Sequence, residues 1–243
     1  MEIELYQEMY SLERQHWWFL ARREILTGLI SYYLPQGQVL DVGCGTGFIL
    51  EELQQSSSKY DAWGVDNSEP AIAFCQQKNL THITQGILGH SNLVEHSFDM
   101  VMFLDVIEHL DEDEQVIKLA KDYLSANGTL LITVPAYQFL WSAHDQIHGH
   151  KRRYTKKKVT ELLHNAGYEV AYISYFNTLL FPLIAIARLL GNLRDRRQAS
   201  DVNLPPPLIN QFLHQIFRWE RHFLPYLSFP FGVSIVCIAK PQS

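Results

Sequence analysis

The stretch Val39-Leu40-Asp41-Val42-Gly43-Cys44-Gly45-Thr46-Gly47 decides the fold of this chain of 243 residues. A short apolar run encloses an acid, and glycine then occupies every second position. Glycine adopts positive φ angles at little steric cost and lets the backbone approach a ligand closely. The pattern therefore predicts a buried strand that turns sharply into a helix, with a ligand over the turn.

The acid before the first glycine indicates which ligand suits this turn. A dinucleotide loop has the spacing GxGxxG and binds a pyrophosphate, whereas this loop reads GxGxG. A carboxylate at Asp41 repels a pyrophosphate and attracts an ammonium or sulfonium group. Asp66 ends the next predicted strand, where its two oxygens are suited to accept hydrogen bonds from ribose hydroxyls. Together the two acids favour S-adenosylmethionine over NAD.

Strand and helix patterns alternate along the chain, which predicts an α/β fold with a doubly wound sheet. The predicted strands are 38–42, 62–65, 82–84, 98–104, 129–134, 168–175 and 232–239. The predicted helices are 1–33, 48–55, 70–78, 112–124, 155–165, 179–193 and 208–223. The helix 112–124 is expected to close at Asn127-Gly128. In such a sheet the ligand lies at the carboxyl ends of the strands.

We expect a single domain over residues 1–243. It divides into an N-terminal helical cap (1–36), a Rossmann-like core (37–176 and 231–240) and a helical insertion between the last two strands (177–230). The insertion is predicted to be a lid over the acceptor, a dimer interface or a surface for peripheral membrane contact. The sequence does not indicate an oligomeric state.

Composition narrows the partners and the compartment. The net charge of −6 argues against nucleic acid as a partner. Cys44, Cys75 and Cys237 show no CxxC spacing, so neither a disulfide framework nor a zinc site is expected. We expect a cytoplasmic protein, because no signal peptide is recognised and the longest apolar run, 179–190, is too short to span a bilayer.

Several motifs together resemble the class I S-adenosylmethionine-dependent methyltransferases. They are the glycine loop, Asp66, Ser97-Phe98-Asp99-Met100-Val101 and Asp105-Val106-Ile107-Glu108-His109-Leu110. The resemblance covers about residues 37–175. It implies a seven-stranded sheet of order 3-2-1-4-5-7-6 with strand 7 antiparallel, a methyl donor over the first two strands, and an acceptor near the ends of strands four and five.

The resemblance also implies the cofactor contacts. Many relatives carry an acid after the third strand to hold the adenine amino group, but here Ile87 stands near that position, so Gln85 or a backbone group is expected to serve. The expected cofactor-binding residues are Asp41, Gly43, Gly45, Gly47, Asp66, Asn67, Gln85 and Asp105.

The segment 141–154 follows the fifth strand and should overhang the acceptor. It is similar to a pattern W-S-x-x-D-x-x-x-G-H-x-R-R-Y-T of an uncharacterised bacterial group of small-molecule methyltransferases. A methyl transfer to oxygen needs a base, for which histidine is suited. His144 and His150 are the candidates, with Asp145 to orient an imidazole. The expected acceptor-binding residues are Trp141, Arg152, Arg153 and Tyr154.

The expected function is transfer of a methyl group to a small-molecule acceptor, at a hydroxyl oxygen of a partly apolar substrate. No metal is expected. The set Asp105, Glu108 and His109 nevertheless resembles the divalent-ion site of ubiquinone-pathway and small-RNA methyltransferases. In such a site His144, His148 or His150 would add a further ligand. The alternatives are a catalytically inactive S-adenosylmethionine-binding module and a metal-assisted RNA methyltransferase that uses the basic run 151–158.

Overall fold

The chain folds around one seven-stranded sheet whose order is β3-β2-β1-β4-β5-β7-β6. The computed structural model describes residues 3–56, 59–91, 93–193 and 204–242. All neighbouring strands are parallel except β7, which is antiparallel to both β5 and β6. The predicted order and the direction of the last strand are confirmed. The strands are β1 (Gly37–Val42), β2 (Tyr60–Asp66), β3 (His82–Gln85), β4 (Phe98–Leu104), β5 (Leu124–Pro135), β6 (Tyr168–Phe176) and β7 (Ser234–Pro241).

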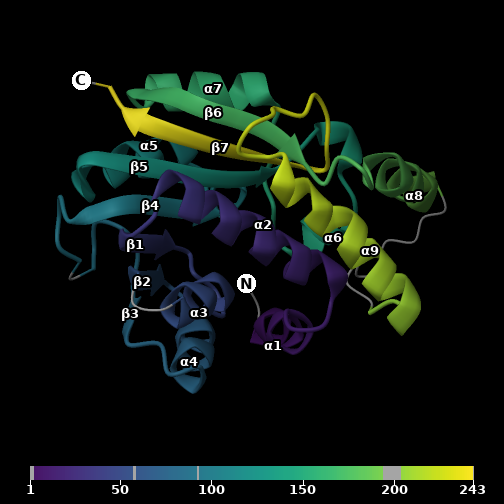
Figure 1. The fold of residues 1–243 in the computed structure, drawn as a ribbon, viewed down its shortest axis with the longest axis horizontal. Helices are drawn as coiled ribbons and strands as arrows, with labels where there is room; N and C mark the ends of the chain where they lie inside the picture. Colours follow the sequence, from purple (N-terminus) through teal and green to yellow (C-terminus); the bar gives the residue numbers. More distant parts are fainter. Residues whose placement is uncertain (1–2, 57–58, 92, 194–203, 243) are drawn as a thin grey trace.

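Helices cover both faces of the sheet (Figure 1). They are α1 (Ile3–Leu12), α2 (Trp17–Tyr33), α3 (Phe48–Gln55), α4 (Glu69–Gln77), α5 (Asp113–Leu119), α6 (Ala143–Ile147), α7 (Lys156–Asn165), α8 (Phe181–Leu193) and α9 (Pro207–Trp219), with short 3₁₀ turns between some of them. No helix in the described part of the chain has both the length and the apolar character needed to cross a bilayer.

The alternation of side chains along the strands builds two cores. In β4, Met100 and Met102 pack with α2, α3 and α9, whereas Val101 and Phe103 pack on the opposite face with α5 and α7. Successive residues of a strand point to opposite faces, so a strand that is apolar throughout is covered on both sides. This burial explains the uninterrupted apolar stretches in the sequence.

Two local predictions were wrong, and one short helix was not predicted. The predicted helix 1–33 is two helices, because Glu13 turns away to bind Lys78 and His16 caps α2, its Nδ1 accepting from the Trp18 N–H at 3.3 Å. The predicted helix 112–124 ends early, because Leu124 already pairs with Phe98 in the sheet, so Asn127-Gly128 lies within β5 and closes no helix.

The helix that was not predicted is α6. This short helix begins at a capping box in which the Ser142 N–H donates to Asp145 Oδ2 at 2.9 Å.

Candidate functional site

The glycine loop lies at the carboxyl end of β1 and is open on one side. Gly43, Gly45 and Gly47 have φ angles of +72°, +55° and +75°. A Cβ atom at Gly43 would lie 2.7 Å from Val106, which follows β4, whereas a Cβ atom at Gly45 would meet nothing within 4 Å. The loop is therefore pressed against the neighbouring strand end and leaves open space above Gly45.

Two carboxylates flank this space. Asp66 accepts hydrogen bonds from the backbone N–H groups of Gly45 and Ser68, both at 2.9 Å, so its position over the loop is set by the backbone. Asp41 is buried, and its Oδ1 has no hydrogen-bond partner among the described residues. Burial raises the pKa of Asp41 to about 7, against the lowering influence of Arg22 and with a further raising influence from Asp66.

Arg22 brings a positive charge from α2 to the ends of β4 and β5. Its Nη2 lies 2.7 Å from Asp105 Oδ2 and 3.2 Å from Thr133 Oγ1. Asp105 has a φ of +61°, a conformation that costs energy for a residue other than glycine and is often found at functional sites. The strained backbone directs this carboxylate toward Arg22.

These groups fit a nucleoside that carries an amino acid. The unpartnered oxygen of Asp41 is a ready acceptor for an ammonium group, Arg22 can bind a carboxylate, and Asp66 retains lone pairs for hydroxyls. Asn67 and Gln85 are exposed and follow or end the strands β2 and β3, which pair at Asp66 and Gln85. The cofactor-binding residues expected from the sequence thus gather at the ends of four neighbouring strands.

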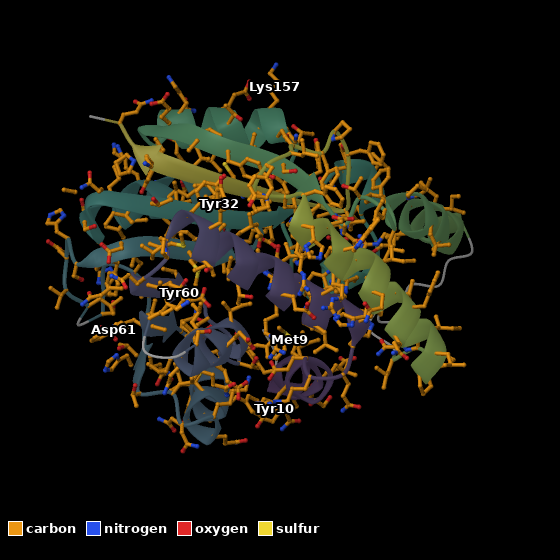
Figure 2. The ribbon with its side chains drawn as sticks, in the orientation of Figure 1. Met9, Tyr10, Tyr32, Tyr60, Asp61 and Lys157 are labelled. Atoms are coloured by element: carbon orange, nitrogen blue, oxygen red, sulfur yellow. The ribbon has the colours of Figure 1, made fainter. Side chains whose placement is uncertain are left out.

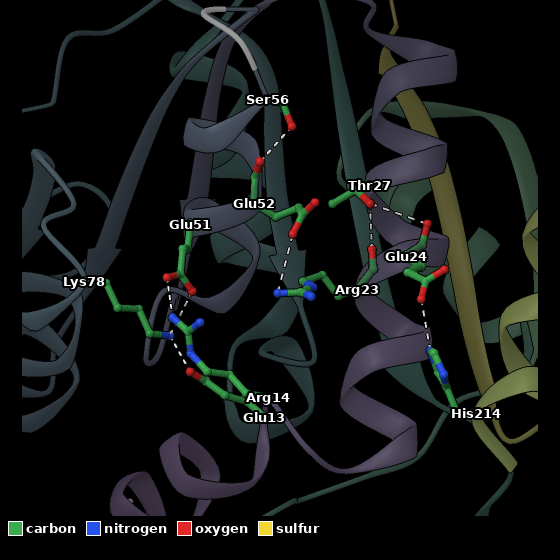
Figure 3. Close-up of polar contacts among 10 residues, drawn as sticks. All are labelled: Glu13, Arg14, Arg23, Glu24, Thr27, Glu51, Glu52, Ser56, Lys78 and His214. Carbon is green, nitrogen blue, oxygen red and sulfur yellow. Dashed lines mark hydrogen bonds and ion pairs between the residues drawn. The ribbon is translucent and has the colours of Figure 1, made fainter. Parts of the chain in front are cut away.

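A polar group that the sequence did not reveal lies on the N-terminal side of the glycine loop. Glu13 accepts from Thr46 of the glycine loop. It also pairs with Lys78 after α4, and Lys78 lies 3.9 Å from Glu51 (Figure 3). Tyr6 of α1 is buried, and burial together with Asp66 raises its pKa to about 12. The only sequence signal was the threonine inside the glycine loop, which does not reveal its partner.

Asp145 is the centre of a second polar group, beyond β5. Its side chain is fully buried and accepts two hydrogen bonds from Arg153, from Nε at 2.8 Å and from Nη2 at 2.9 Å. His150 Nδ1 lies 2.8 Å from Asp145 Oδ1. Burial alone would raise the pKa of Asp145, but the bonds from His150 and Arg153 outweigh it and hold that pKa well below its usual range. Asp145 is therefore an anion that orients the His150 ring.

Four histidine rings cluster around this carboxylate. The ring of His150 lies 4.7 Å from that of His109 and 6.0 Å from that of His144, and the rings of His144 and His148 are 4.1 Å apart. Burial lowers the pKa of His109 and of His148 to about 4, and it lowers that of His144 as well. These three imidazoles are thus neutral at physiological pH, and their ring nitrogens can bind a cation.

Glu108 adds an acid to the cluster. It is fully buried, and neither carboxyl oxygen has a hydrogen-bond partner among the described residues. Burial, and next the charge of Asp105, raise its pKa well above the usual range. Potential ligand atoms of Glu108, His109 and His150 lie within 4.8 Å of one another. The third member of the sequence-expected metal set, Asp105, pairs with Arg22 instead, and His150 takes its place in this group.

The expected acceptor-binding residues are largely engaged within the protein. Arg152 donates to the carbonyl oxygen of Leu110 at 2.9 Å, and the Tyr154 hydroxyl donates to Asp113 at 2.7 Å. Trp141 is half-buried at the start of the segment. These contacts position the segment that holds His150. They also engage part of the basic run 151–158, since Lys151, Arg152 and Arg153 all pair with acids.

An open groove of about 810 Å³ lies elsewhere, between α2, α3 and the turn after α9. Tyr32 and Tyr60, both labelled in Figure 2, line it. Tyr60 begins β2 and Asp66 ends it, and the ends of such a seven-residue strand are about 20 Å apart. The groove is therefore at the amino end of the sheet, separate from the residues described above.

Comparisons with known proteins agree with this geometry. A family described as "Methyltransferase domain" matches residues 13–173. The chain is 26% identical to a Mycolicibacterium smegmatis protein named "probable S-adenosylmethionine-dependent methyltransferase", over 65% of this chain and 62% of the relative. It is also 26% identical to the malonyl-[acyl-carrier protein] O-methyltransferase of Bacillus cereus, over 51% of this chain and 47% of the relative. The chain thus spans between about half and two thirds of the length of these relatives.

A solved structure supports the fold alone. The crystal structure of a SAM-dependent methyltransferase from Thermotoga maritima has a TM-score of 0.60 and 16% identity, and the match covers 99% of this chain and 96% of that one.

Proposed function

Because this chain belongs to the methyltransferase-domain family, we propose that it transfers a methyl group from S-adenosylmethionine to a hydroxyl oxygen of a small, partly apolar acceptor. The observation that carries the proposal is the arrangement of two polar groups. A cofactor pocket at Asp41 and Asp66 lies at the ends of β1 and β2, and a histidine oriented by a buried carboxylate follows β5.

The cofactor supplies a methyl group on a positively charged sulfur. Asp41 binds the ammonium group with its free oxygen, Arg22 binds the carboxylate, and Asp66 accepts from the ribose hydroxyls. Asn67 and Gln85 lie on the adenine side of Asp66. Gly45 leaves the space in which the nucleoside lies against the loop.

His150 is the proposed base. Asp145 holds its Nδ1, which leaves Nε2 to take the proton of the acceptor hydroxyl as the methyl group is transferred. Arg153 keeps Asp145 ionised and in place, so it acts as a positioning residue. Positioning in line with the methyl group supplies much of the remaining rate. His144, beside His150, is the second candidate base, and the half-buried Trp141 is the remaining candidate to border the acceptor.

Transfer to oxygen is supported by the presence of a base with an orienting carboxylate, since a hydroxyl must lose its proton. The similarity to a protein named as an O-methyltransferase points the same way.

A second candidate mechanism uses a divalent cation. The orphaned carboxyl of Glu108 and the rings of His109 and His150 form a mixed oxygen and nitrogen set of the kind that binds first-row divalent metals. A cation there would lower the pKa of a bound hydroxyl and take over the task of the base. Chelation separates the two mechanisms: activity that survives dialysis against EDTA and is lost in His150→Gln assigns the proton to His150.

Cofactor binding can be tested without an acceptor. S-adenosylhomocysteine should raise the melting temperature of the chain, because a ligand that binds only the folded state stabilises it. Asp66→Ala should remove this shift, and Asp61→Ala, a surface carboxylate at the other end of β2, should keep it. If the chain melts at the same temperature with millimolar ligand, the proposal fails.

The base is tested with tritiated S-adenosylmethionine and a panel of phenols and long-chain alcohols. His150→Gln should reduce turnover by about 10²- to 10⁴-fold with an unchanged cofactor shift. His164→Gln, on the exposed end of α7, is the matched control. Equal turnover in the two variants would exclude His150 as the base.

A further inference from the structure

Helix α1 lies along α4 and runs in the same direction. Three contacts follow one another in the same order along both segments. They pair Tyr6 with Ser68, Tyr10 with Phe74, and Glu13 with Lys78. The rings of Tyr10 and Phe74 are stacked, with their centroids 4.5 Å apart. Because Ser68 caps the start of α4 and Lys78 its end, Tyr6 is brought to the end of α4 that adjoins Asp66.

The Tyr6 hydroxyl lies near the groups that are expected to bind the ribose. Its side chain is 6% exposed. Burial and next the charge of Asp66 raise the pKa of Tyr6, whereas a hydrogen bond with the Ser68 side chain lowers it, and Cys44 of the glycine loop raises it further. A tyrosine hydroxyl has one proton and two lone pairs, so it can make a further bond besides the one with Ser68.

The carboxyl end of α1 is fixed to the glycine loop. Glu13 follows the helix, accepts from Thr46 and pairs with Lys78 (Figure 3). The side chains of Glu13 and Lys78 are 2% and 1% exposed. The next residue, Arg14, pairs with Glu51 of α3. Because a buried ion pair is costly to break, this end of α1 is held in place beside the loop.

The rest of α1 is held more weakly. Among its described side chains, 4–12, none belongs to the three hydrophobic clusters that join the sheet to the other helices. Segments with few buried apolar contacts open at a low free energy. Asp41 and Asp66 are 3% and 6% exposed, so a nucleoside bound to both acids is largely enclosed. A segment beside the pocket therefore has to move when the cofactor enters, and α1 is suited to do so.

We propose that α1 covers the cofactor pocket, opening at its amino end to admit the cofactor and closing with the Tyr6 hydroxyl on a ribose hydroxyl. This inference rests on the proposed function, because it takes S-adenosylmethionine as the ligand. Tyr6 is then a cofactor-contact residue. Glu13 is a positioning residue, since it fixes the end of α1 about which the helix closes.

The ribose contact is tested by isothermal titration of the full chain with S-adenosylhomocysteine and with 5′-methylthioadenosine. The second ligand keeps the nucleoside but lacks the amino acid. Tyr6→Phe removes only the hydroxyl and should weaken the binding of both ligands by about three- to tenfold, the effect of one lost hydrogen bond. Tyr10→Phe is the matched control: it keeps the ring that stacks on Phe74, and it should bind both ligands as the unaltered chain does.

The closure is tested by hydrogen–deuterium exchange. With S-adenosylhomocysteine at ten times its Kd, the amides of α1 should exchange about tenfold more slowly if the helix must open before the ligand leaves. The amides of α7, which packs on the other face of the sheet from α2, should exchange at the same rate with and without ligand.

The role of Glu13 is tested by combining variants. Glu13→Gln weakens the pair with Lys78. If Glu13 places Tyr6, adding Tyr6→Phe to Glu13→Gln should have little further effect on the affinity for S-adenosylhomocysteine. A role for Glu13 in stability alone predicts instead that Tyr6→Phe has its full effect in both backgrounds. Unchanged exchange in α7 shows that the Glu13→Gln chain is folded.

These results separate failure of the inference from failure of the proposed function. If the unaltered chain binds S-adenosylhomocysteine and Tyr6→Phe binds it equally well, the ribose contact is refuted. Exchange of α1 that the bound ligand leaves unchanged refutes the closure. If the unaltered chain binds neither ligand, the methyltransferase proposal itself is refuted.

Discussion

Asp41 should make cofactor affinity depend on pH. Its buried carboxyl has a pKa of about 7 in the free chain, raised by burial and by Asp66 and partly offset by Arg22. An ammonium group beside the free Oδ1 favours the ionised form and lowers this pKa. Ligand binding therefore releases a proton, so the affinity rises with pH and levels off above about 7.

The magnitude follows from the fraction of chains in which Asp41 is already ionised. With a pKa of about 7, this fraction is about 3% at pH 5.5 and about 75% at pH 7.5. If only the ionised form binds, the affinity changes by about 25-fold across these two pH units, or close to 2 kcal/mol. Without the shift, a carboxyl with the ordinary value of 3.8 would be ionised throughout this range and would produce almost no change.

Isothermal titration with S-adenosylhomocysteine measures both the affinity and the proton release. This ligand retains the ammonium group and transfers no methyl. Asp41→Asn should bind about tenfold to hundredfold more weakly at pH 7.5, from the loss of a charged hydrogen bond, and its affinity should no longer follow pH in this window. An equally steep pH dependence in Asp41→Asn would refute the reasoning, because another group would then be the source.

Three further outcomes are expected. Gly45→Ala should lower the cofactor affinity measured by titration more than tenfold, because its Cβ would enter the ligand space. Its free energy of unfolding in urea should fall by only about 1–2 kcal/mol, the cost of a φ near +55° for a residue other than glycine. Arg153→Met should cost about 3–5 kcal/mol in urea unfolding, because it leaves Asp145 buried without its cation; a loss under 1 kcal/mol would show that water reaches Asp145. Burial raises the pKa of Glu220 from 4.5 to about 7. Its protonated form therefore adds stability that is full below pH 4.5 and is lost as the pH rises through 7, roughly 3 kcal/mol in all. Glu220→Gln should flatten the fall in melting temperature between pH 5 and 8.

The alternation of strands and helices and the turn at the glycine loop could be predicted from local rules, whereas the strand order was implied by the resemblance to the class I methyltransferases. Glycines at a strand end demand an unusual backbone, and continuous apolar strands demand cover on both faces. The contacts of Glu13 with Thr46 and Lys78 could not be predicted, since they join three segments that only the fold brings together. The break in the predicted N-terminal helix has the same origin, because the partners of Glu13 lie far along the chain.

The segment after β5 shows how function and support are divided among neighbouring residues. Its residue types indicated polar chemistry, but the sequence offers no means of telling the histidine that we propose as the base from the arginine that supports its carboxylate partner. In the structure Arg153 is buried against Asp145, while His150 uses one nitrogen for Asp145 and keeps the other available. An arginine next to a candidate base is thus as well suited to fixing an anion as to binding a substrate.

Helix α9 marks the limit of periodicity as evidence. The spacing of Leu208, Phe212 and Trp219 predicts an amphipathic helix, and the usual inference places their side toward the core. The inward side of α9 carries apolar residues too, since Phe217 is fully buried and Leu213 and Ile216 pack against the core. The same side places His214 and Arg218 against Glu24 of α2. Helix α9 therefore has apolar residues on both sides, and their spacing does not say which of them are buried.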